Sequence, residues 1–112
     1  MTRDDALAAA NALASLLTVL PEATRVVSFG KSHDALRVHV MDEGMQDAVH
    51  RLRSAFGVPT WDLHRSAEHD HLTATWPALV VTTCWDWQCP PAGLLAYAKF
   101  DGMMVGAADA RR

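Results

Sequence analysis

Histidine and cysteine are the residues of this chain whose types and spacing could support chemistry. Imidazole is a common metal ligand and the side chain that titrates nearest neutral pH, and the 112 residues include six histidines and two cysteines. His64, His71 and Cys84 fall in segments where polar and apolar residues alternate. If two-residue turns join these segments at 67–68 and 77–78, His64 lies opposite His71 and His71 lies opposite Cys84.

Such a row could bind a metal ion. Directly opposed residues on paired strands have β-carbons about 5 Å apart, so His64, His71 and Cys84 could share a zinc or copper ion, with His39, His69 or Asp62 as a fourth ligand. The alternative is that these side chains form a hydrated strand face. We favour that alternative, with no cofactor, because the sequence has no compact metal motif such as paired CxxC.

Catalysis is disfavoured by the same placement. Cys84 beside His71 and either Asp62 or Asp86 could supply a nucleophile, a base and an orienting group. An open sheet face, however, provides no pocket that excludes water. The sequence also has no glycine-rich phosphate loop and no HExxH motif. We therefore expect a protein that acts by binding, with no catalytic residues.

The elements that would position these residues follow from hydrophobic periodicity. Thr2 and Asp5 form a variant capping box, and apolar residues then recur at helical spacing until Pro21. Asp42 can cap a second helix, which ends near Gly57 and Pro59. We predict helices over 3–20 and from Asp42 to about 56, a strand hairpin within 25–40 around the loop 31–34, and a meander of strands over 61–66, 71–76 and 79–86.

The register of these strands predicts the fold class. In the meander, alternation places one apolar face against the helices and the His/Cys row on the opposite face. In the hairpin, we pair Gly30 with Ala35, Phe29 with Leu36, and Val27 with Val38. The prediction is an α+β domain of order α-β-β-α-β-β-β, in which two helices pack on one face of an antiparallel sheet and an apolar C-terminal segment follows.

The C-terminal segment differs in character from the rest of the chain. We assign residues 1–89 to a single domain and 90–112 to an extension, which could be an exchanged arm, a short helix or a mobile tail. Aromatic and long apolar side chains cluster around its start, as in protein interfaces. We expect a contact with a second copy, giving a homodimer, or with another protein. The predicted contact residues are Trp87, Leu94, Leu95, Tyr97 and Phe100.

The composition of the chain disfavours some classes of binding partner. The formal charge is -3 and the halves carry similar charge, whereas nucleic-acid-binding proteins concentrate positive charge. We see no signal peptide or membrane span, and two cysteines are too few for a disulfide scaffold. Arginine outnumbers lysine eight to two, a bias we associate with bacterial genomes. We expect a cytoplasmic bacterial protein that binds neither nucleic acid nor membrane, in a process that the sequence does not identify.

Overall fold

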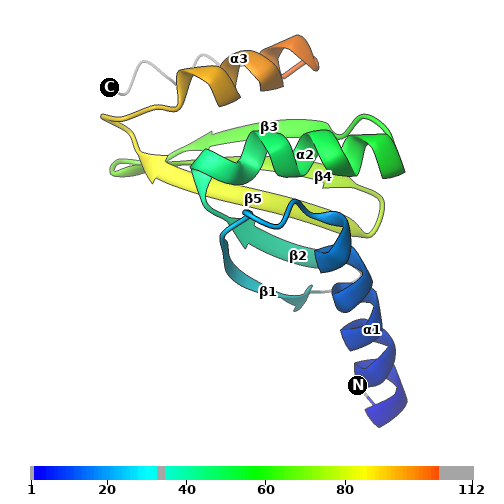
Figure 1. The fold of residues 1–112 in the computed structure, drawn as a ribbon. Coiled ribbons are helices and arrows are strands. Elements are labelled where there is room, and N and C mark those ends of the chain that lie inside the picture. Colours follow the sequence, from blue (N-terminus) through cyan, green and yellow to red (C-terminus); the bar gives the residue numbers. More distant parts are fainter. Residues whose placement is uncertain (1, 33–34, 104–112) are drawn as a thin grey trace.

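The structure is a computed structural model that describes residues 2–32 and 35–103. Its elements follow one another along the chain as three helices and five strands (Figure 1). They are α1 (Arg3–Val19), β1 (Val26–Ser32), β2 (Ala35–Val40), α2 (Asp42–Phe56), β3 (Thr60–Arg65), β4 (His69–Trp76), β5 (Leu79–Asp86) and α3 (Ala92–Phe100).

The strands form one sheet in the order β1-β2-β5-β4-β3. The α+β class is confirmed, and the neighbouring strands are antiparallel except for β2 and β5, which are parallel. A parallel pair needs a long crossover connection, and here α2, β3 and β4 together provide it. The prediction of an entirely antiparallel sheet was therefore wrong at this pair.

The prediction of two helices was also wrong, because residues Ala92–Phe100 form α3. Pro91 precedes the helix at its N-cap, where the missing N–H of proline costs nothing. Leu94 and Ala98 are four residues apart and therefore lie on one helical face, and both are buried in the core. The first part of the C-terminal segment thus packs on the same core as the rest of the described chain.

The hairpin between β1 and β2 has a different register from the predicted one. Phe29 pairs with Val38, and the ladder continues to Ser32 and Ala35, so the connection has two residues rather than the four that a pairing of Gly30 with Ala35 implies. A two-residue connection is the commonest hairpin form. The register also shifts between Val26 and Ser28, and Val27 at this irregularity is exposed rather than directed into the core.

The capping box and the meander register are confirmed. The Thr2 hydroxyl accepts a hydrogen bond from the Asp5 amide, and the Asp5 carboxylate accepts one from the Thr2 amide. In the meander, His64 pairs with His71 and His71 pairs with Cys84. The apolar face of the sheet and the three helices share one buried cluster, which includes Leu16, Met45, Leu52, Leu72, Trp76, Val81 and Leu94.

Candidate functional site

The predicted row of His and Cys side chains lies on the sheet face opposite the core. The imidazole rings of His64 and His71 have their centres 6.3 Å apart. One further contact joins β5 to β2, since Cys84 Sγ lies 3.6 Å from His39 Nε2. The row therefore contains two separate close pairs, His64 with His71 and Cys84 with His39.

These donors do not surround a common point. Among the residues that the structure describes, no three His, Cys, Asp or Glu side chains are grouped so that they could hold a metal ion. The reason is geometric, because side chains stand roughly perpendicular to a sheet and neighbours in a row run side by side. Metal binding by His64, His71 and Cys84 would require side-chain rotation and stays an untested alternative to the hydrated strand face.

The histidines of this face influence one another electrostatically. Partial desolvation beside the sheet lowers the pKa of His71 below its ordinary value of 6.5, and the neighbouring His64, His69 and His39 lower it further because protonation would place like charges together. His71 is thus biased toward its neutral form. A neutral imidazole can bind a metal ion, but it is equally suited to a hydrated strand face.

The predicted contact residues around the C-terminal segment divide into two groups. Leu94 is only 4% exposed, while Leu95 and Tyr97 are partly buried against the core. Tyr97 also makes an edge-to-face contact with Trp61, with ring centres 6.1 Å apart. Trp87 is half-buried, whereas Phe100 is 88% exposed. Most of this apolar surface is therefore covered within the chain, and Phe100 is the clear exception.

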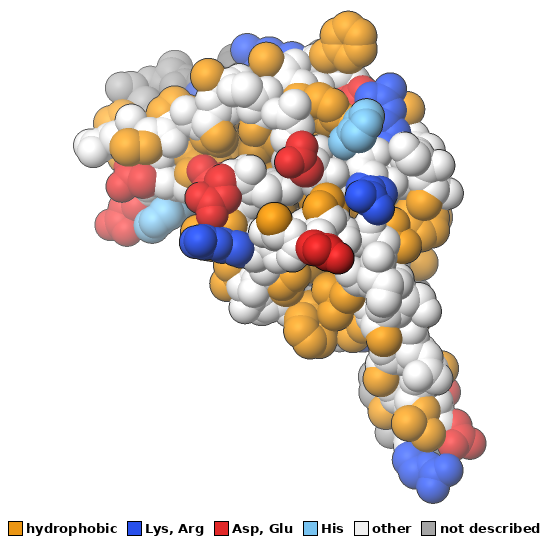
Figure 2. Space-filling model, viewed as in Figure 1, with side chains coloured by type: hydrophobic (Ala, Val, Ile, Leu, Met, Phe, Trp, Pro, Cys, Tyr) orange, Lys and Arg blue, Asp and Glu red, His pale blue; other side chains and the backbone are white. Residues whose placement is uncertain are grey.

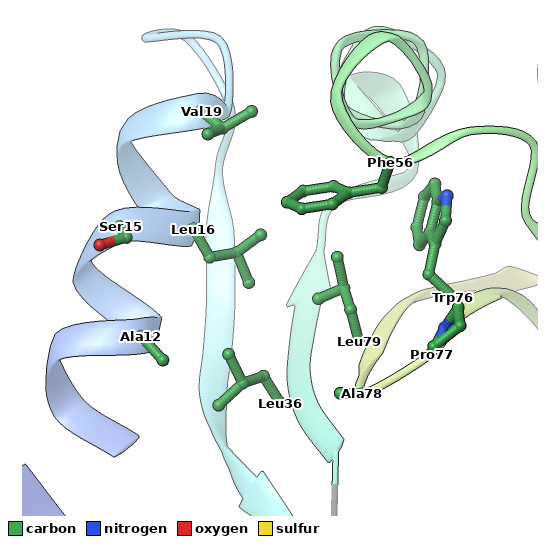
Figure 3. A pocket seen from close by; sticks show the side chains of 10 residues that line it. All are labelled: Ala12, Ser15, Leu16, Val19, Leu36, Phe56, Trp76, Pro77, Ala78 and Leu79. Atoms are coloured by element: carbon green, nitrogen blue, oxygen red, sulfur yellow. The ribbon is translucent and has the colours of Figure 1, made fainter. Parts of the chain in front are cut away.

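An apolar groove lies elsewhere on the described part of the chain, between α1 and the end of α2. This groove has a volume of about 540 Å³. Figure 3 shows side chains of α1 on one side, Phe56 and Trp76 on the other, and Leu36 and Leu79 between them. Among the described residues, no lining residue is charged, and the Ser15 hydroxyl is the one polar side-chain group apart from the Trp76 indole nitrogen, which donates a hydrogen bond to the Gly57 carbonyl oxygen. The lining residues are Ala12, Ser15, Leu16, Val19, Leu36, Phe56, Trp76, Pro77, Ala78 and Leu79.

The helix that forms one wall of the groove also projects from the body of the molecule (Figures 1 and 2). No charged residue occurs between Ala6 and Leu20, although a fifth of the chain is charged. Leu16 is nevertheless the buried residue of α1, and Leu7 is 50% exposed. Figure 2 shows apolar side chains along the projecting helix and charged ones at its tip.

Sequence reasoning assigned this helix to the core and missed the groove. The available signal was the extent of apolar surface, since a helix facing one sheet needs an apolar stripe rather than an almost uncharged circumference. For the walls of the groove other than α1, no local sequence pattern indicated a binding surface. Phe56, Trp76 and Leu36 come from three separate segments and meet only through the sheet order.

Comparisons with known proteins add no relative. No protein-family model matches the chain, and neither the curated proteins nor the solved structures contain a match. Within the described part of the chain, no helix is both long and apolar enough to cross a membrane.

Proposed function

We propose that this protein is a non-catalytic binding protein whose groove between α1 and α2 docks an apolar helix of a protein partner. The observation that carries the proposal is the uncharged lining of the groove in a chain that is one-fifth charged. Recognition of an amphipathic or apolar helix in a hydrophobic groove is a recurrent mode of protein binding. The sequence-based prediction of a binding protein is retained, with a different surface as its site.

The lining favours a protein partner over a small molecule. Ligand sites combine apolar walls with a few convergent polar groups that fix the orientation of the ligand. Here Ser15 is the sole lining residue with a free hydroxyl, and Trp76 already uses its indole nitrogen within the chain. A catalytic role would need titratable groups, and none of the described residues that line the groove carries one.

The shape of the groove suits a helix. One wall is α1 itself, the floor is Leu36 of β2 with Leu79 of β5, and the far wall comprises Phe56 and the turn between β4 and β5. A helix lying in this groove would contact protein on three sides. Burial of such a helix would remove apolar surface from water, which contributes a favourable free energy of about 25 cal/mol per Å².

The test uses a neutral, fluorescein-labelled helical peptide rich in alanine and leucine as the probe. Fluorescence anisotropy is measured while the full chain is titrated into the peptide. We expect saturable binding that Ala12→Arg weakens by about tenfold or more, because the substitution places a charge in an apolar site. Ala12 is exposed and forms part of the α1 wall, so the substitution does not disturb the core.

The matched control is Asn11→Arg, which places the same charge on the adjacent residue. Asn11 is exposed and does not line the groove, so this variant should bind the peptide as the original chain does. Absence of peptide binding in the original chain and in all variants would contradict the proposal. Equal weakening by Ala12→Arg and Asn11→Arg would also contradict it, because binding would then respond to charge in general.

A further inference from the structure

The projecting half of α1 is itself apolar, and the described residues leave most of it uncovered. Residues 6–14 contain no charged side chain, and Asn11 is their one polar residue. Helices that are apolar on all sides are normally buried, and isolated helices shorter than about 12–15 residues are marginal in water. Yet only Ala9 and Leu13 in this stretch are even partly buried. The exposed apolar surface of residues 6–14 is therefore a candidate contact surface for a partner.

Helical geometry shows which way each side of residues 6–14 faces. Ala9 and Leu13 are less exposed than their neighbours and mark the side that faces the sheet layer. Ala12 faces the groove. Because successive residues are about 100° apart, Ala10 lies opposite Ala12 and Asn11 lies opposite Ala9 and Leu13. The stretch thus has three apolar sides and one polar side.

This pattern matches the three-walled groove. A helix lying in the groove contacts protein through three sides and exposes the fourth at the open mouth. The lengths also agree closely, since the groove extends along α1 from Ala12 to Val19, about 12 Å, and the projecting residues 6–12 span about 10 Å. Neither the groove lining nor residues 6–12 carry a charge.

We propose that the groove of each chain is filled by the projecting half of α1 from a second copy of the same chain. This inference rests on the proposed function of the groove and names its partner. The two α1 helices run antiparallel and cross at Ala12, so that residues 6–12 of one copy lie beside 12–18 of the other. Ala8 and Ala12 face the opposing α1 helix, where their small side chains permit a close approach.

The remaining apolar sides are buried by the same arrangement. Ala6 and Ala9 of the second copy rest on Leu36 and Leu79, while Leu7 and Ala10 face Phe56 and Trp76. Asn11 points out of the mouth of the groove. A two-fold axis makes the exchange reciprocal, so both projecting helices and both grooves are covered and the assembly closes as a dimer. A different protein could fill the groove but would leave the projecting helix uncovered.

The crossing point can be tested by a symmetric cross-link. In a Cys84→Ser, Cys89→Ser background, we introduce Ala12→Cys or, as the matched control, Asn11→Cys. Only Ala12 lies next to its own copy across the two-fold axis. Mild oxidation followed by non-reducing electrophoresis should convert most of the Ala12→Cys protein to a covalent dimer and little of the Asn11→Cys protein. Equal cross-linking of the two variants would overturn the arrangement.

A second variant separates this inference from the proposed function. Ala10 does not line the groove of its own chain, but in the dimer it enters the groove of the partner. Ala10→Arg should therefore weaken dimerisation by about tenfold or more in light scattering. It should leave the groove open, so that the alanine- and leucine-rich peptide binds this variant at least as tightly as the original chain. Asn11→Arg should remain dimeric.

The outcomes distinguish the two proposals. A monomeric original chain that binds the peptide through Ala12 would overturn the self-pairing and leave the groove as a site for another protein. A dimer that is unaffected by Ala10→Arg and Ala12→Arg would overturn the self-pairing and place the dimer contact elsewhere. A dimer lost in Ala10→Arg, together with peptide binding that is retained in Ala10→Arg and lost in Ala12→Arg, supports both.

Discussion

The indole nitrogen of Trp61 donates a hydrogen bond of 3.2 Å to a carboxylate oxygen of Asp101, 40 residues away in the chain. The other carboxylate oxygen pairs with the Arg53 guanidinium, so that one side chain links β3, α2 and the C-cap of α3. The Asp101 side chain is 2% exposed and that of Arg53 is 34% exposed. This cluster holds α3 on the domain.

Replacing Asp101 by alanine should lower the free energy of unfolding. The Trp61 indole loses its acceptor, but Arg53 keeps access to water, so we expect a loss of about 2 kcal/mol rather than the larger cost of a fully buried pair. Urea denaturation monitored by tryptophan fluorescence measures it. The exposed Asp47→Ala serves as the control and should change stability little. Equal stability of both variants would show that the cluster is dispensable.

The meander was predictable because its determinants are local. Alternating residues define two faces, short turns fix the register, and a slip by one residue would place Leu72 and Trp76 on the solvent side. The pairing of His64, His71 and Cys84 followed from this pattern. What the pattern could not provide was side-chain direction, which decides whether donors in a row converge on an ion.

The remaining features depend on contacts between distant segments. The parallel pairing of β2 with β5 is set by how α2 crosses the sheet, and no local pattern specifies that packing. α3 was uncertain because its short apolar segment was compatible with a helix, an exchanged arm or a tail. The docking of α3 depends on the hydrogen bonds that Asp101 makes with Trp61 and Arg53, which are far away in the sequence. The groove likewise needs Leu36, Phe56 and Trp76 to meet.

Gly57 should be intolerant of substitution. Its φ of 90° and ψ of -171° lie in a region that only glycine adopts readily, and its carbonyl oxygen accepts the Trp76 indole hydrogen bond of 2.7 Å. We expect Gly57→Ala to cost about 1–3 kcal/mol of stability in urea denaturation. Gly30→Ala is the control, because a β-carbon there meets nothing within 4 Å. Similar losses in both would contradict the conformational explanation.

The sequence-based zinc hypothesis can be tested by native mass spectrometry on protein purified without a histidine tag or added metal. Because the donors lie in a row, we expect no stoichiometric ion and no change of melting temperature with EDTA. Zinc added afterwards should leave the melting temperature nearly unchanged. One ion per chain that is lost in His71→Ala would instead establish the metal site on this face.

Acidification should destabilise the fold through His71. Its pKa in the folded state is lowered by partial desolvation and by His64, His69 and His39, so the unfolded chain binds more protons near and below pH 6.5. The folded state is therefore not destabilised by His71 at pH values above the pKa that His71 has in the unfolded chain. Destabilisation sets in as the pH falls through that value toward the lower pKa of His71 in the folded state. Thermal unfolding between pH 5 and 8 should show a smaller acid-side decrease in His71→Gln than in the original chain. His50→Gln, on the exposed side of α2, should retain the original decrease. Identical pH profiles for His71→Gln and the original chain would rule out His71 as a source of the pH dependence.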